Sequence, residues 1–297
     1  MRISITLLTI CSGLWCEAAE PPQYWPQYRG PAGSGVAAGD APLEFGPKKN
    51  LLWRADAGPG HSSPSIWGDS LFVTSFDAAS KKLELLAFDR RKGRIRWRQT
   101  IPAAEIEKVH AVSSPATATP VVDGERVYVY FGSSGLFCYD FAGKLVWSSP
   151  IPVAKVNFGS GASPALAGDA LVLPRDDPDR HLLALERKTG KPLWDVKLDS
   201  RMSGSGDGHA TPLVWKDQII LHRAGEVAAY SAKDGTRRWW VNIGSQGTGT
   251  PVIDGDLLFV GAWGGGDPDL RDPIPDWETL VQKYDKDGNG MTPSHRC

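Results

Sequence analysis

The chain has 297 residues, of which 41% are hydrophobic and 23% are charged, a composition typical of one large or two ordinary globular domains. Lys and Arg number 33 against 34 Asp and Glu, so the chain lacks the basic excess typical of proteins that bind nucleic acid or an anionic membrane. We therefore expect no nucleic-acid partner. The 33 Gly and 23 Pro indicate many turns, and 12 Trp is a high number for a chain of this length.

The first 19 residues have the features of a secretory signal peptide. Arg2 precedes an apolar run over residues 3–15, and two alanines follow at the expected cleavage site. This run is too short to span a bilayer, and no later stretch reaches about 20 apolar residues. We expect residues 1–19 to be removed on export, no transmembrane segment, and a mature protein that is periplasmic, on the cell surface or secreted. Lipidation at Cys11 is the alternative.

Four segments share one frame, in which a glycine stands four residues before a tryptophan. The pairs are Gly93 and Trp97, Gly143 and Trp147, Gly190 and Trp194, and Gly235 and Trp239. A Ser/Thr-Pro pair opens each unit, with the hydroxyl residue at Ser63, Thr119, Ser163 and Thr211, and a fifth pair begins at Thr250. The prolines of these pairs lie 39 to 56 residues apart, a period that fits a propeller blade of four short strands.

The glycine and the tryptophan have separate expected roles in such a blade. The glycine supplies the positive φ that a tight hairpin requires. The indole, on the outer strand, is expected to cover the seam between neighbouring blades, because a four-stranded sheet cannot bury both of its faces alone. The sequence therefore predicts an all-β fold, a β-propeller of four-stranded blades over residues 20–263. The complete units are expected at about 61–101, 112–151, 161–198 and 208–243, and a fifth begins at Thr250.

Residues 184–194 read A-L-E-R-K-T-G-K-P-L-W and resemble the tryptophan-docking motif of quinoprotein β-propellers, A-x-D-x-x-T-G-K-x-x-W, with Glu186 in place of Asp. The other three copies match this motif more loosely. Residues 25–31, W-P-Q-Y-R-G-P, are similar to the opening of many secreted bacterial members. Over about residues 24–263 the chain thus resembles the pyrroloquinoline-quinone (PQQ)-like repeat family, which includes the outer-membrane assembly lipoprotein BamB and the quinoprotein alcohol dehydrogenases.

The resemblance implies a ring of seven or eight blades, of which this chain resembles an N-terminal portion with four to five. In this family an N-terminal strand completes the final blade and closes the ring, and Trp53 looks like part of such a strand. An open arc leaves blade faces and a strand edge unpaired. We therefore predict self-association of the isolated chain through its open blade faces.

Residues 264–297 predict a linker, a short helix at 276–284 and an incomplete EF-hand-like loop. The expected calcium ligands are Asp285, Asp287, Asn289 and the backbone carbonyl of Met291. Position 12 of the loop, which normally supplies a bidentate Glu, is Arg296, so we expect calcium as a weakly bound cofactor. A plain surface turn is the alternative.

The commonest hydrolase, zinc and nucleotide motifs are absent, which argues against a catalytic role. His61 and His209 each stand just before the first strand of a blade, where they would either serve an axial metal or acid–base site or hydrogen-bond the loop backbone. Quinoprotein alcohol dehydrogenases carry two adjacent cysteines over the cofactor. No two cysteines are adjacent here, so we expect no bound PQQ.

These patterns favour an exported, non-catalytic propeller that acts as an envelope scaffold and binds a protein or a polysaccharide. A PQQ-dependent dehydrogenase, or a degenerate relative of one, is the alternative. Calcium binding through the C-terminal loop is a further alternative.

Overall fold

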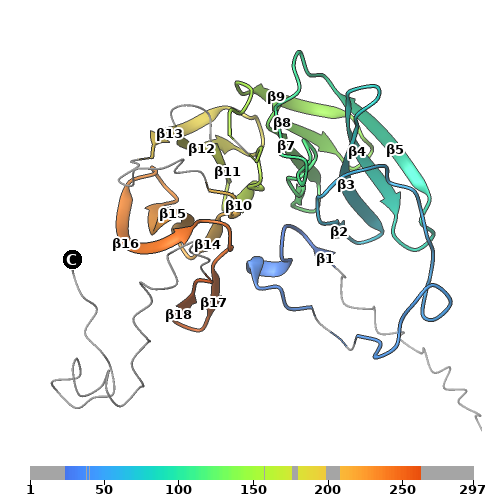
Figure 1. Ribbon diagram of the computed structural model, residues 1–297, viewed down its shortest axis with the longest axis horizontal. Coiled ribbons are helices and arrows are strands. Elements are labelled where there is room, and N and C mark those ends of the chain that lie inside the picture. Colours follow the sequence, from blue (N-terminus) through green and yellow to red (C-terminus); the bar gives the residue numbers. More distant parts are fainter. Residues whose placement is uncertain are drawn as a thin grey trace, which may run out of the picture.

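The computed structural model describes residues 24–261 apart from 38, 40, 157, 176–179 and 199–207, and in the last strand of the fourth sheet it leaves the side chains of 244–246 undescribed. The signal peptide, the C-terminal helix and the EF-hand-like loop predicted above lie outside the described residues. Five antiparallel sheets follow one another along an arc that is not closed into a ring (Figure 1). Within the described ranges, no helix is long and apolar enough to cross a membrane.

Each sheet is built from strands that are consecutive in the chain. The first contains β1 (Tyr24–Trp25), β2 (Ser65–Trp67), β3 (Ser70–Asp77), β4 (Lys82–Asp89) and β5 (Ile95–Ile101). The second contains β6 (Val121–Val122), β7 (Arg126–Phe131), β8 (Gly135–Asp140) and β9 (Leu145–Pro150). The third contains β10 (Ala165–Ala167), β11 (Ala170–Arg175), β12 (His181–Glu186) and β13 (Pro192–Lys197). The predicted propeller blades are confirmed.

The fourth sheet has three named strands, although it is a complete blade. It contains β14 (Leu213–Trp215), β15 (Gln218–Ser231) and β16 (Arg237–Gln246). The backbone N–H of Ala232 donates to the carbonyl of Asp217, 2.9 Å away, so the two ends of β15 lie together. Gly225, with φ of 87°, lies in the middle of β15. We infer that β15 folds back on itself at this glycine and supplies both middle strands of the blade.

Over the described residues, which end at 261, the fifth sheet has two strands. It contains β17 (Val252–Asp254) and β18 (Leu257–Phe259), and the side chains of Leu257 and Phe259 are exposed. The sequence prediction of four complete units and a fifth begun at Thr250 is confirmed over the described residues.

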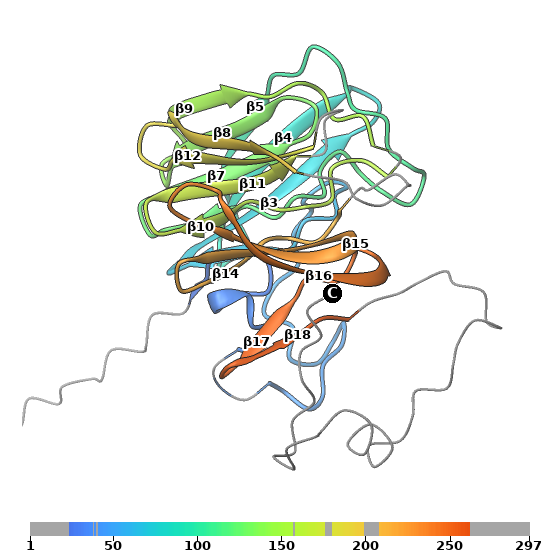
Figure 2. The same cartoon turned by 90° about the vertical axis from the view of Figure 1, so that its left-hand side faces the viewer.

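The hydrophobic core lies between successive sheets rather than within any one of them. On β7, Val127, Val129 and Phe131 pack against the first sheet. Tyr128 and Tyr130, the alternate residues, pack against the third sheet. Successive side chains of a strand point to opposite faces, so the inner strands of a middle blade, such as β7 and β8, bury both faces and are almost entirely apolar. Figure 2 shows the strands of the stacked sheets side by side.

Cys138, on β8, belongs to the core between the second and third sheets. Its side chain is fully buried, and this burial raises the pKa of the thiol to about 12. A thiol that stays protonated is a poor nucleophile, so Cys138 serves packing.

Candidate functional site

Three tryptophans of the repeat, Trp97, Trp147 and Trp194, dock on the blade that follows them. A Cβ atom added to Gly143 would lie 2.8 Å from the indole of Trp97, and one added to Gly190 would lie 2.6 Å from that of Trp147. The indole nitrogen Nε1 of Trp97 donates to the carbonyl of Phe141, 2.9 Å away in the same turn. Trp194 repeats the contact with Gly235, where the added Cβ would lie 2.8 Å away.

Glycine is therefore required at these turns for two reasons. The φ angles of Gly93, Gly143, Gly190 and Gly235 lie between 67° and 87°, in the left-handed region that disfavours other residues. The indole of the preceding blade also occupies the space that a side chain would need. The repeated Gly and Trp residues are thus contact partners, each glycine with the tryptophan of the blade before it.

The tryptophan–glycine contact is present at the first blade of the arc, and at the fourth blade the tryptophan makes a different contact. Trp53 docks on Gly93, where an added Cβ would lie 2.5 Å from its ring, and its Nε1 donates to the carbonyl of Arg90 at 2.7 Å. Trp53 thus takes the place of the tryptophan of a preceding blade, although residues 51–54 form no strand. At the other end, Trp239 donates to Gln218 of its own blade, 2.9 Å away, and the described residues place no glycine turn against it.

The Ser/Thr-Pro pairs form a second ladder between blades. The hydroxyl oxygen of each accepts the backbone N–H of the equivalent residue one blade earlier. The donor and acceptor residues are Ser63 to Thr119 at 3.0 Å, Thr119 to Ser163 at 2.9 Å, Ser163 to Thr211 at 3.1 Å and Thr211 to Thr250 at 3.1 Å. Sequence reasoning noted the pair but missed the hydroxyl's role. Its signal was a Ser or Thr at that position in all five copies.

These two sets of contacts divide the arc into two faces. The turns that contain Gly93, Gly143, Gly190 and Gly235 lie at one end of the blades, which we call the turn face. The connections between blades, residues 102–120 and 151–164, and the short turn at residues 132–134 lie at the other end, which we call the loop face. This follows from the antiparallel order of the strands, since every second turn of a blade lies at the same end.

A buried carboxylate holds the loop face together. The side chain of Glu107 is 4% exposed, and its Oε2 accepts hydrogen bonds from the backbone N–H of Ser160 at 2.9 Å and from the hydroxyl of Ser160 at 3.0 Å. Its backbone N–H donates to the hydroxyl of Ser133, 3.0 Å away. Burial raises the pKa of Glu107, and the bonds from Ser160 oppose this shift. Glu107 thereby joins three segments of the loop face.

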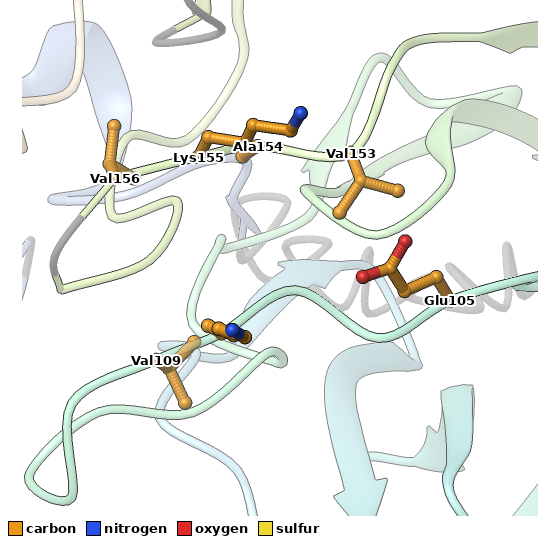
Figure 3. A pocket seen from close by; sticks show the side chains of 7 residues that line it. Glu105, Val109, Val153, Ala154, Lys155 and Val156 are labelled. Carbon is orange, nitrogen blue, oxygen red and sulfur yellow. The ribbon is translucent and has the colours of Figure 1, made fainter.

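An open cavity of about 400 Å³ lies beside this junction, between the two connections. Its lining residues are Glu105, Lys108, Val109, Val153, Ala154, Lys155 and Val156. Figure 3 shows Glu105 and Val109 on one wall and the residues of 153–156 on the other. The cavity falls within the range of small-molecule and peptide sites, about 300–1,000 Å³. The repeat gave no sign of it, because the two stretches that line it, 105–109 and 153–156, do not follow the repeated motifs.

The two histidines singled out by the sequence are joined to neighbouring loops through their main chains. The backbone N–H of His61 donates to the carbonyl of Ala116 at 2.9 Å, and the backbone N–H of His209 donates to that of Gly247 at 3.1 Å. The ring of His209 meets Phe158 edge-on, with centroids 6.0 Å apart. No cluster of three or more His, Cys, Asp or Glu able to hold a metal occurs in the described part of the chain. The predicted calcium ligands Asp285, Asp287, Asn289 and Met291 lie outside it.

A family model described as outer membrane protein assembly factor BamB matches residues 45–265. The chain belongs to this family. Among solved structures, a europium-containing methanol dehydrogenase is similar at 14% identity and a TM-score of 0.51, over 67% of this chain and 45% of that one. BamB from Moraxella catarrhalis is similar at 16% identity and a TM-score of 0.46, over 69% of this chain and 57% of that one. No curated protein matches significantly.

These similarities cover only part of each relative. The chain spans about half the length of the two solved proteins. The methanol dehydrogenase shows that this BamB-family chain shares its blade architecture, and at this identity it shows the fold alone.

The first described residues, 24–35, run along the inner strands of several blades. Trp25 pairs with Ile66 of the first blade, and the carbonyl of Pro26 accepts the N–H of Val122 of the second blade at 2.8 Å. The short 3₁₀ helix η1 (Pro31–Gly33) contacts β14 of the fourth blade. Residues 24–35 thus lie along the concave side of the arc (Figure 1).

Proposed function

We propose that the chain forms the propeller of an exported, non-catalytic scaffold that binds a partner protein through the loop face. The observation that carries this proposal is an open cavity on the loop face, between the two connections, while residues 24–35 contact the inner strands of the arc. Membership of the BamB family, whose description names an assembly factor, supports a binding role.

The structural difference between the turn face and the loop face supports the same proposal. The glycine turns of the turn face are in contact with indoles from one blade to the next. The lining residues of the cavity fall between the repeated units, on the two connections of the loop face. Binding residues often lie on loops that a rigid scaffold holds in position.

Site-specific photo-crosslinking tests the proposal. A photoreactive residue replaces Val112, which is 71% exposed on the loop face, or, as a matched control, the exposed Lys92 on the turn face. In cells that produce the protein, we expect a discrete crosslinked protein from position 112 and none from position 92. Crosslinks only from position 92, or none from either position, would reject a partner at the loop face.

A cofactor titration separates the scaffold from the alternative, a PQQ-dependent dehydrogenase. We expect the purified chain, mixed with PQQ and Ca²⁺, to show no shift of cofactor absorbance and no alcohol-dependent dye reduction. A stoichiometric change in the cofactor spectrum would favour the dehydrogenase.

A further inference from the structure

The cavity on the loop face has apolar walls and a positively charged rim. Val109 and Val153 are half-buried and Val156 is buried, so the walls are aliphatic. Lys108 and Lys155 stand one on each connection, and both are exposed. Neither lysine forms a hydrogen bond or an ion pair with any described residue. Two lysines and a single carboxylate, that of Glu105, give the lining a net charge of +1.

The walls are held in place before any ligand arrives. Glu107 lies in the same connection as Lys108, and its carboxylate is bonded to Ser160, which follows the cavity-lining residues of the other connection. Ala154, on that second wall, donates its N–H to the carbonyl of Gly132 at 2.9 Å. A ligand that binds between fixed walls loses less free energy to the ordering of loops.

We propose that this cavity binds an extended acidic segment of a partner protein, with an aliphatic side chain against Val109 and Val153 and a carboxylate between Lys108 and Lys155. The inference rests on the proposed function, because it names the class of partner that the loop face takes. The uncommitted lysines supply charge complementarity, and the aliphatic walls supply an apolar surface of matching size.

The lining favours a peptide over a polysaccharide. Sugar rings usually stack on aromatic side chains, and none of the seven lining residues is aromatic. Valine and alanine walls match the side chains of Val, Leu or Ile. Because the two lysines are exposed, we expect each of them to add little to the affinity for the peptide by itself, and we expect that affinity to fall as salt is added.

Fluorescence anisotropy with three labelled peptides tests the inference on the full chain. The probes are DVDLDG, its uncharged counterpart NVNLNG, and DSDSDG, which keeps the charge and lacks the aliphatic side chains. We expect only DVDLDG to bind measurably, and the double variant Lys108→Glu/Lys155→Glu to weaken that binding at least tenfold at low salt. The matched control Lys92→Glu/Lys188→Glu reverses two exposed lysines on the turn face and should change binding less than twofold.

The variant Val153→Ser tests the apolar wall separately, because Val153 is half-buried and its replacement leaves both lysines in place. We expect it to weaken binding of DVDLDG severalfold. Equal binding of all three peptides, or unchanged binding in the Lys108/Lys155 variant, would overturn the inference. So would binding of a labelled acidic oligosaccharide that depends on the same lysines when DVDLDG does not bind. If crosslinking from position 112 persists while DVDLDG fails, the inference falls and the proposed function stands.

Discussion

The turn face and the loop face lie at opposite ends of the same blades, and they use their sequences differently. At the turn face one contact recurs, in which the indole of one blade covers a glycine of the next. At the loop face, the two connections 102–120 and 151–164 share only the Ser/Thr-Pro pair at their ends, and before that pair they follow no common motif. Glu107 makes a junction there that recurs nowhere else in the described residues. The comparison teaches that the repeated residues build the blade stack, whereas the irregular ones are free to form a site.

The largest expected effect tests the packing role of the turn face. Gly190→Ala should lower the free energy of unfolding by about 2–4 kcal/mol, since it adds overpacking against Trp147 to the cost of a positive φ. Gly168→Ala is the matched control in the same blade. Its φ of 60° is also positive, but an added Cβ would meet nothing within 4 Å, so about 1 kcal/mol is expected. Urea denaturation measures both variants, and equal losses would show that the indole contact contributes nothing.

The second effect concerns the hydroxyl ladder that anchors the connections. Thr119 is 2% exposed and its hydroxyl oxygen accepts the N–H of Ser63, so Thr119→Val leaves this half-buried donor without its partner. We expect a loss of about 1–2 kcal/mol in the free energy of unfolding. The control Thr100→Val, at an exposed position of β5, should change it by less than about 0.5 kcal/mol. An unchanged Thr119→Val protein would contradict a stabilising role for the ladder.

The smallest effect is a change in pH dependence at the loop face. Burial raises the pKa of Glu107 above its ordinary value of 4.5, so between that value and the raised one the folded chain binds more protons than the unfolded chain. The contribution of Glu107 to stability is therefore fully present below pH 4.5 and is lost as the pH rises through the raised pKa. Glu107→Gln keeps an acceptor for Ser160 and removes the ionisation.

We expect the fall in stability with rising pH above 4.5 to be shallower in Glu107→Gln, as measured by urea midpoints at several pH values. The exposed Glu105→Gln serves as the control and should retain the slope of the unmodified chain. Equal slopes in all three proteins would mean that Glu107 is not a buried, titrating group.

The sequence predicted the blades because the same turn and strand pattern occurs in several copies. The glycine of each hairpin and the tryptophan four residues later appear in four copies, so their structural role could be inferred without coordinates. The spacing did not show that each tryptophan contacts the glycine of the next blade, such as Trp97 with Gly143, because a contact between units leaves no mark on the spacing within a unit. The expectation that Trp53 lies in a strand was wrong over the described residues, where residues 51–54 belong to no strand.

By itself, then, the sequence determined the fold class, the number of complete units and the residues that join them, because periodic burial and turn geometry are local properties of the chain. Only the tertiary structure decided which residues meet on the loop face. Glu107 and Ser160 are 53 residues apart, and the cavity needs two irregular connections brought together by the stacking of blades. The position of residues 24–35 inside the arc was decided in the same way, since it depends on inner strands from three different blades.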